Sequence, residues 1–288
     1  MLETDIVDSN TENFLRQIDM DGFCIVEDVI PEHQIEHIRD EIMHAERKQH
    51  DRTEADRNRT RSRGHRVSAK GVSALRQLIN YTQCFESYVA DERIMGIVEG
   101  VFGPWSRISC TDCIINEPGN DRAYWHADWP YNRTNASHIS APYPDTPMHL
   151  STIWMLSDFS EKNGGTLVIP GSHRMRDNPA SGHMSISQNA PYPTEINVSG
   201  TAGSVFVADS RLWHSTAPNH TNVPRPAILI RYAPWWLNLN PTHIGKVEHT
   251  MMVVETKGKN YEQEPIEKNV YEGLSETVKP LYRHWVEA

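Results

Sequence analysis

The chain has 288 residues, a formal net charge of −10 and 38% hydrophobic residues. This acidic balance argues against nucleic acid or an anionic membrane surface as a partner, because both carry negative charge. No segment is apolar for long enough to span a bilayer, and the first residues lack the basic and apolar regions of a signal peptide. We therefore expect a cytoplasmic protein, monomeric or homodimeric.

The first third of the chain is expected to be mainly helical. Residues 31–47 place Ile35, Ile38 and Ile42 at the three- and four-residue spacing of an amphipathic helix. A second helical region is expected over about 84–101, where apolar residues recur at a similar spacing.

Between these two regions, residues 48–66 carry seven basic and three acidic residues. One interpretation is a solvated, mobile loop, which charge runs usually form. The other is a basic lid that draws an anionic ligand into the protein.

From Ile108 onward, short apolar segments broken by Gly, Pro and Asn are typical of strands. The expected strands are 106–117, 148–158, 165–170, 194–199, 203–208, 212–217 and 226–234. This pattern favours a mainly β fold, a double-stranded β-helix (a jelly roll, cupin-like) flanked by N-terminal α-helices. We expect one domain over residues 1–288, with a helical layer at about 11–103, a jelly-roll core at about 106–236 and a C-terminal extension at 237–288.

The segment 124–128 puts an imidazole, His126, and a carboxylate, Asp128, two residues apart. In an extended segment these side chains point to the same side and can bind one metal ion together. His214 offers a third ligand, and two histidines with one carboxylate are typical of non-haem Fe(II) oxygenases. Residues 129–147 follow directly, and a loop of this length is expected to form a wall of the substrate site.

Arg225 lies eleven residues after His214, at the start of an apolar strand. A guanidinium there can bind a carboxylate by a bidentate pair. Arg231 has the same parity on that strand, so the facing of the side chains does not distinguish the two arginines. The competing histidines His149, His173 and His183 lack a following arginine at a suitable distance on a new apolar strand.

Together these motifs resemble the phytanoyl-CoA dioxygenase-like family of Fe(II)/2-oxoglutarate-dependent oxygenases. The resemblance also rests on Asp21-Gly22-Phe23-Cys24-Ile25-Val26, on the glycine-rich segment 163–173 and on Gly203-Ser204-Val205-Phe206-Val207. It covers roughly residues 12 to 236, and it implies that Fe(II), 2-oxoglutarate and O2 take part in the reaction. His126, Asp128 and His214 would then be the metal ligands and the catalytic centre, with Arg225 on the far carboxylate of 2-oxoglutarate.

The resemblance implies further contacts to 2-oxoglutarate. Trp154 matches a pocket tryptophan of the family, although a core position is the alternative, and Thr166 is a candidate hydrogen-bond partner. Cys113 falls where the family has an apolar pocket residue; its CxxC with Cys110 is otherwise typical of two strand residues. Tyr124 stands where several fungal relatives carry glutamine. The upstream cation of the family would be Lys70 or Arg76.

We therefore expect a dioxygenase that oxidises an unactivated C–H bond of a small molecule, first of all by hydroxylation, in secondary metabolism. Desaturation, cyclisation and endoperoxidation stay open. One alternative is a cupin-like metal dioxygenase or isomerase that does not use 2-oxoglutarate; another is a non-catalytic barrel that binds a ligand. The aromatic residues Trp129, Tyr131, Trp235 and Trp236 favour a bulky apolar substrate, whereas the basic segment 48–66 favours an anionic one.

Overall fold

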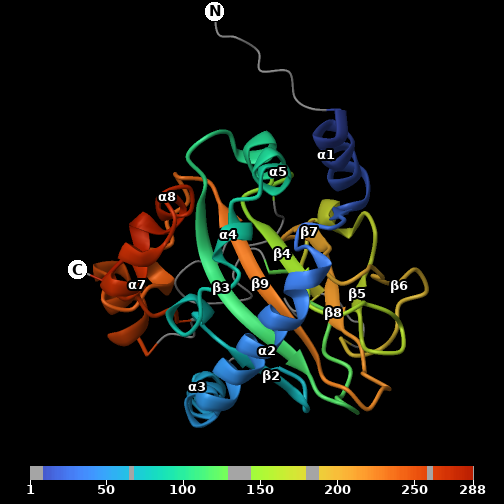
Figure 1. Cartoon of the computed structure of the whole chain (residues 1–288), viewed down its shortest axis with the longest axis horizontal. Coiled ribbons are helices and arrows are strands. Elements are labelled where there is room, and N and C mark those ends of the chain that lie inside the picture. The colour runs from blue at the N-terminus through green and yellow to red at the C-terminus, as the bar shows by residue number, and fades with distance from the viewer. Residues whose placement is uncertain (1–8, 65–67, 129–143, 180–187, 258–261, 288) are drawn as a thin grey trace, which may run out of the picture.

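The strands of the chain form two antiparallel sheets that face each other, with helices packed outside (Figure 1). The structure is a computed structural model and describes residues 9–64, 68–128, 144–179, 188–257 and 262–287. Its strands are β1 (Phe23–Val26), β2 (Val72–Leu75), β3 (Arg107–Asn116), β4 (Leu150–Met155), β5 (Thr166–Val168), β6 (Ile196–Asn197), β7 (Val205–Asp209), β8 (His214–Thr216) and β9 (Arg225–Ala233).

The α-helices are α1 (Ser9–Asp21), α2 (Glu32–Lys48), α3 (His50–Ser62), α4 (Glu86–Val89), α5 (Glu92–Phe102), α6 (Val247–His249), α7 (Lys268–Gly273) and α8 (Lys279–Tyr282). Short 3-10 or π turns cover Leu78–Asn80, Ser172–Arg174, Asn240–Thr242, Thr250–Val254 and Arg283–Trp285. None of the described helices is both long and apolar enough to cross a membrane.

The large sheet has six strands in the order β1-β7-β4-β9-β3-β2, and the small sheet has three in the order β6-β5-β8. The strands that the sequence predicts all occur; β7 ends one residue later and β9 begins one residue earlier than expected, and the other ends are shorter. The expected jelly-roll core flanked by helices is confirmed. The two four-residue strands β1 and β2 were not among the predicted strands, because they are too short to show an alternating pattern.

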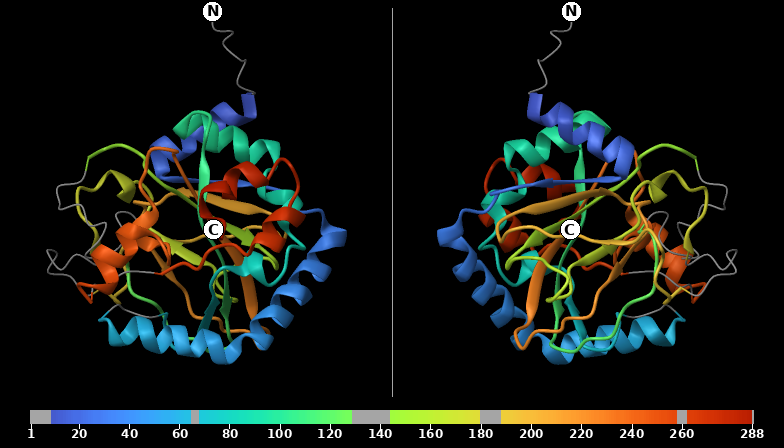
Figure 2. Two further views of the ribbon diagram at one scale, coloured as in Figure 1. Left: turned by 90° about the vertical axis from the view of Figure 1, so that its left-hand side faces the viewer. Right: turned by 90° about the vertical axis from the view of Figure 1, so that its right-hand side faces the viewer.

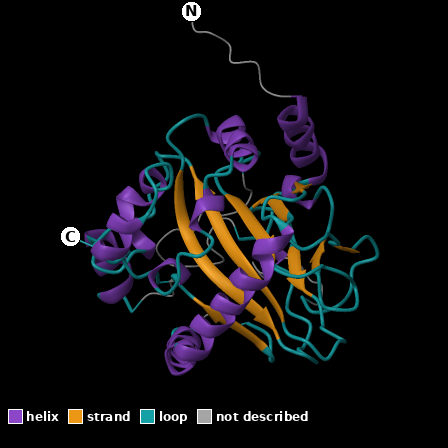
Figure 3. Ribbon diagram, in the orientation of Figure 1, coloured by secondary structure: helices purple, strands orange, loops and turns teal. Residues whose placement is uncertain are grey.

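Alternation along the strands separates the two faces of the large sheet. Trp154, Ile228 and Ile230 point outward into the main core, where α2 and α5 pack on the sheet. Figure 3 shows α2 crossing this face. The neighbouring positions Ala227 and Phe206 point inward, where they meet Val168 of the small sheet. The space between the sheets is therefore lined by the odd-numbered residues of β9.

The segment 21–26 and the glycine-rich segment 163–173 contact each other at Gly22. Its φ of +90° is a conformation that glycine adopts readily, and a Cβ there would lie 2.6 Å from Nδ1 of His173. The backbone N–H of Gly171 donates to the carbonyl of Asp21 over 2.8 Å. His173 is thus a buried structural residue that joins the small-sheet side of the barrel to β1.

Most of the basic segment 48–66 is helical: residues 50–62 form α3, which lies below the sheets and follows α2 (Figure 2). Three of its arginines bind carboxylates of the C-terminal extension. Arg59 and Arg63 lie 3.2 and 2.5 Å from the two carboxylate oxygens of Glu262, and Arg52 pairs with Glu264. The helix lacks an apolar stripe, so hydrophobic periodicity gave no sign of it.

The predicted helix over 84–101 is two helices, α4 and α5. The break falls at Asp91, whose backbone is extended. Its carboxylate caps the start of α5 by accepting from the N–H of Arg93 over 3.0 Å. An N-cap residue does not continue the preceding helix, because its own backbone is not helical.

The C-terminal extension packs on the outer face of the core. Leu281, Tyr282 and Trp285 are buried among the residues that cover the large sheet. The hydroxyl of Tyr282 lies 2.6 Å from that of Thr111 on β3, with both groups buried. This bond ties the extension to the central strands.

We expect Tyr282→Phe to lower the free energy of unfolding by about 1–3 kcal/mol, because it leaves the buried Thr111 hydroxyl without its partner. Urea denaturation measures this. Thr111→Val added to Tyr282→Phe is expected to restore part of the loss, since both polar groups are then gone. Tyr271→Phe, at a half-buried position of α7, is the control and is expected to change stability by about 0.5 kcal/mol or less. Strictly additive losses in the double variant would show that the two hydroxyls are not coupled.

Candidate metal centre and the cavity beside it

The three candidate ligands come together because two backbone segments pair at the edge of the small sheet. The N–H of His126 donates to the carbonyl of His214 over 3.1 Å, and the reverse bond measures 2.8 Å. Asp128 lies two residues further along and is held by its N–H, which donates to the carbonyl of Ser210 over 2.8 Å.

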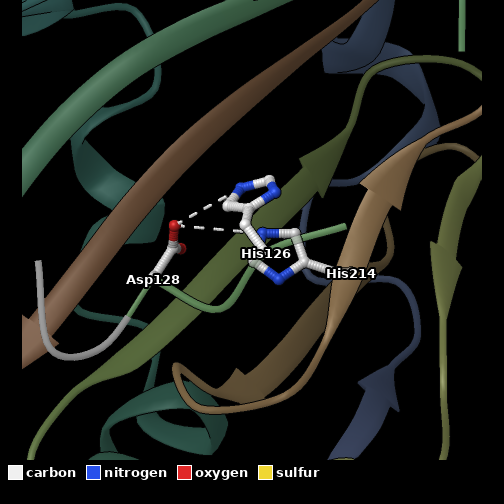
Figure 4. A group of neighbouring side chains, drawn as sticks. All are labelled: His126, Asp128 and His214. Atoms are coloured by element: carbon white, nitrogen blue, oxygen red, sulfur yellow. Dashed lines mark ion pairs between the residues drawn. The ribbon is translucent and has the colours of Figure 1, made fainter. Parts of the chain in front are cut away.

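The side chains of His126, Asp128 and His214 point toward one another (Figure 4). Oδ1 of Asp128 lies 3.8 Å from Nε2 of His126 and 3.9 Å from Nε2 of His214. One ligand atom from each residue lies within 4.8 Å of the others, and among the described residues this is the one such group of metal-binding side chains. The spacing suits a single ion contacted by all three.

Hydrogen bonds fix which nitrogen of each imidazole is free to bind a metal. Nδ1 of His126 lies 3.1 Å from the carbonyl of Tyr124, and Nδ1 of His214 lies 2.9 Å from the carbonyl of Leu212. Because a carbonyl only accepts, each Nδ1 carries the hydrogen and each Nε2 keeps its lone pair. Both lone pairs are therefore available at the side of the ring that faces Asp128.

The protonation states also suit metal binding. Burial, together with His214 nearby, lowers the pKa of His126 to about 3, so this imidazole is neutral. Burial alone would raise the pKa of Asp128, but Arg231 and the two histidines outweigh it and hold the pKa below its ordinary value. The site thus presents a neutral imidazole and a carboxylate, the forms that bind metal ions.

Two side chains hold the carboxylate of Asp128. The hydroxyl of Ser151 donates to Oδ2 over 2.8 Å, and Nη2 of Arg231 lies 2.9 Å from Oδ1. Ser151 also lies 2.8 Å from the hydroxyl of Ser210. Neither Ser151 nor this role of Arg231 was predicted. The signal available in the sequence was a polar residue, Ser151, on the same face of β4 as Ile153 and Met155.

Arg225 differs from Arg231 in its surroundings. It is buried at the far end of the inward face of β9, with its guanidinium 4.2 Å from the ring centre of Phe159. No carboxylate among the described residues forms an ion pair with it, and its Nε has no hydrogen-bond partner there. Burial lowers the pKa of Arg225 to about 9, so the group is still charged at neutral pH. A buried cation of this kind requires an anion to offset its desolvation.

A cavity of about 270 Å³ opens beside the metal centre. Its walls come from the inward faces of β2, β3 and β9, from one face of α3 and from the C-terminal extension. His149, the competitor of the ligands, lines this cavity with Nε2 2.5 Å from the hydroxyl of Ser109. Burial lowers the pKa of His149 to about 3, so it is a neutral part of the wall.

Three of the remaining predicted site residues lie near the metal centre or face the same interior. The ring of Tyr124 is centred 5.1 Å from that of His126, and Tyr124 lines the cavity. Arg76 also lines it and donates to the hydroxyl of Thr60 over 3.1 Å. Thr166 is buried and shares its strand face with Val168, which points between the sheets.

The structure does not bring Trp154, Cys113 or Lys70 to the metal centre. Trp154 and Cys113 lie in the outer core that the helices cover, on the opposite strand faces from Ser151 and the cavity-lining Ile114. Trp154 is therefore the core tryptophan of the alternative interpretation. Lys70 is exposed and does not line the cavity. The loop predicted as a substrate wall falls mostly on residues 129–143, and these, with His183, lie outside the described residues.

Comparison with known proteins agrees with this geometry. The family model of phytanoyl-CoA dioxygenase (PhyH) matches residues 18–227. A probable alpha-ketoglutarate-dependent hypophosphite dioxygenase from Stutzerimonas stutzeri is 28% identical over 53% of this chain and 54% of the relative. An ectoine dioxygenase from Nocardia farcinica is 25% identical over 75% of each chain.

Among solved structures, the non-haem alpha-ketoglutarate-dependent carbocyclase SnoK from nogalamycin biosynthesis has a similar fold. The match has a TM-score of 0.58 and 19% identity, and it covers 77% of this chain and 83% of SnoK. The family match spans the motif segments from Gly22 to Arg225, so the chain belongs to the phytanoyl-CoA dioxygenase family and is by class an Fe(II)/2-oxoglutarate-dependent dioxygenase.

Proposed function

We propose that His126, Asp128 and His214 bind Fe(II), that Arg225 binds the far carboxylate of 2-oxoglutarate, and that the chain oxidises an unactivated C–H bond of a small molecule. The main support is Arg225, a buried cation on the inward face of β9 that no described carboxylate offsets. A dicarboxylic co-substrate supplies that charge, whereas a metalloenzyme without 2-oxoglutarate leaves it unexplained.

The side chains of the metal centre suit Fe(II), and Arg225 suits the far carboxylate of 2-oxoglutarate. Imidazole nitrogens and a carboxylate oxygen on one face are the ligand set that iron oxygenases use, with the opposite positions left for co-substrates. The arginine fork matches a carboxylate by two parallel hydrogen bonds. Phe159 and Ala227 are apolar neighbours of Arg225 on this side, and its cross-strand partner on β3 is the buried Asn116. Because Arg225 is itself buried, the pair with the carboxylate would form away from water.

When bound, Fe(II) and 2-oxoglutarate supply the oxidising chemistry with O2, and the protein positions them. Ser151 and Arg231 keep the carboxylate of Asp128 oriented towards the two imidazoles. The two Nδ1–H bonds to backbone carbonyls keep the rings in place. The cavity beside the triad then offers the substrate a position next to the metal.

Hydroxylation is the outcome we propose first, because insertion of an oxygen atom requires no further reacting group from the protein. A role in secondary metabolism is part of this proposal and draws on the fold shared with a carbocyclase of nogalamycin biosynthesis. The carbocyclase also indicates that the same fold supports other outcomes, so the product has to be determined on the true substrate.

The test uses thermal unfolding of the protein loaded with Mn(II), a redox-stable substitute for Fe(II). We expect 2-oxoglutarate to raise the melting temperature only when the metal is present, because it chelates the metal. Arg225→Ala is expected to weaken 2-oxoglutarate binding about tenfold to a hundredfold, as loss of a charged hydrogen-bonded pair does, and to leave the metal-dependent shift unchanged.

Arg16→Ala, on the exposed side of α1, is the control and should bind 2-oxoglutarate normally. If Arg225→Ala binds 2-oxoglutarate as well as the unsubstituted protein does, the role of Arg225 is refuted. If 2-oxoglutarate gives no shift at all while the metal does, the cupin-like enzyme without 2-oxoglutarate becomes the better explanation.

Ser151→Ala is expected to weaken metal binding about tenfold, because the carboxylate of Asp128 loses the hydrogen bond that orients it. Competition with a chelating dye measures the affinity. Ser151→Thr keeps the hydroxyl and should retain most of the affinity. Equal affinities in all three proteins would mean that Ser151 does not position the ligand.

A further inference from the structure

The cavity beside the metal centre has a second, polar end that the proposed chemistry does not use. It extends from the triad along β3 and β2 to α3 and to the C-terminal extension. At that end it is lined by Thr53 of α3, Ser73 of β2 and Gln263 of the extension. Gln263 lies beyond residue 227, where the match to the family model ends, whereas Thr53 and Ser73 lie within the match.

The polar atoms at this end lack partners. Gln263 is only 1% exposed, yet neither its side-chain nitrogen nor its oxygen forms a hydrogen bond with any described residue. The hydroxyls of Thr53 and Ser73 also form no hydrogen bond with any described residue, and Thr53 is only 5% exposed. Buried polar groups without partners destabilise a fold, so such a cluster in a cavity wall indicates a ligand that completes the bonds.

Gln263 is fixed in place by its neighbours. Its backbone N–H donates to the carbonyl of Thr242 over 2.8 Å, and its carbonyl accepts from Ile244 over 2.9 Å. The residues on either side, Glu262 and Glu264, form the ion pairs with the arginines of α3. The side-chain amide is therefore presented from a segment that is anchored on both sides.

The charges around the cavity are matched within the protein. Arg57 donates to the backbone carbonyls of Ser68, Ala69 and Val72. Arg231 pairs with Asp128, and Asp56 lies 2.7 Å from Arg59. The lining holds three arginines, Arg57, Arg76 and Arg231, against four carboxylates, Glu54, Asp56, Asp112 and Asp128. It therefore has no excess of positive charge to select an anion, in contrast to the basic lid that composition suggested.

We infer that Gln263, Thr53 and Ser73 form a subsite for an uncharged amide group, a carboxamide or a lactam, on the part of the substrate remote from the oxidised carbon. A primary amide such as that of Gln263 carries a donor and an acceptor in one plane, and it pairs with another amide through two hydrogen bonds. A ketone can accept from the side-chain N–H of Gln263 but has no donor for its side-chain oxygen. A carboxylate also lacks a donor, and its negative charge is repelled by the partial negative charge of that oxygen. The inference that this amide is part of a substrate rests on the proposed function, whereas the inference that the subsite binds an amide does not.

The test compares two small probes of the same ring size, the lactam 2-piperidone and the ketone cyclohexanone. Saturation-transfer difference NMR on the full, metal-free chain gives the dissociation constant of each. We expect 2-piperidone to bind about tenfold more tightly, the value of one or two additional neutral hydrogen bonds. Gln263→Leu should reduce this preference to about twofold or less.

Two further variants complete the design. Thr53→Val, nearly the same in shape, should lose part of the preference and guards against misfolding of Gln263→Leu. Gln17→Leu makes the same substitution at an exposed position of α1 and should keep the full preference. Equal binding of the two probes to the unsubstituted protein, or a preference that survives Gln263→Leu, would overturn the subsite.

Measuring the 2-oxoglutarate shift on the same preparations separates the two proposals. A normal shift without any lactam preference rejects the subsite alone. A lactam preference that depends on Gln263, without a 2-oxoglutarate shift, rejects the proposed cofactor use and retains the amide subsite.

Discussion

The reciprocal backbone hydrogen bonds between His126 and His214 are the constraint on which the centre depends. They pair a segment before the long connection at 129–147 with strand β8, far along the chain. Once this pair is formed, the two imidazoles lie on the same side, with their ring centres 4.2 Å apart. Asp128 then needs only to lie two residues further on to complete the group. A shift of one residue in this pairing would turn one histidine away from Asp128.

A second constraint is the ionic contact between α3 and the C-terminal extension. Glu262 is buried, and its burial would raise its pKa, but Arg63, Arg59 and His249 hold that pKa below its ordinary value. Arg52 and Arg59 of α3, with Arg63 directly after the helix, bind the extension. An adjacent face of α3, at Thr53, Arg57 and Thr60, lines the cavity. Residues outside the family motifs therefore shape the site in which the substrate is expected to lie.

The sequence was sufficient for the parts that follow a short-range rule. His126 and Asp128 share a side because of strand parity, and the spacing of His214 and Arg225 follows the family. The same rule also explains an error. Trp154 and Cys113 were expected to contact 2-oxoglutarate, but strand alternation places them on the outer face, opposite to Ser151 and Ile114. Which face of β3 and β4 points inward depends on long-range sheet pairing, which the sequence does not reveal.

The helix α3 and the subsite at Gln263 were beyond prediction for a related reason. The ion pairs that join α3 to the segment around Gln263 connect residues about 200 positions apart. Neither the helix nor the subsite leaves an apolar period in the sequence. A run of arginines reads as solvated unless its carboxylate partners are known, and those lie in the C-terminal extension.

The most direct test of the centre is anaerobic titration of the protein with Fe(II) and 2-oxoglutarate, recorded by visible spectroscopy. We predict a weak band at about 500 nm, which a keto acid chelated to Fe(II) produces. It should be absent in His126→Ala. If the protein binds Fe(II) but gives no such band with 2-oxoglutarate, the three residues do not form the centre of a 2-oxoglutarate-dependent dioxygenase.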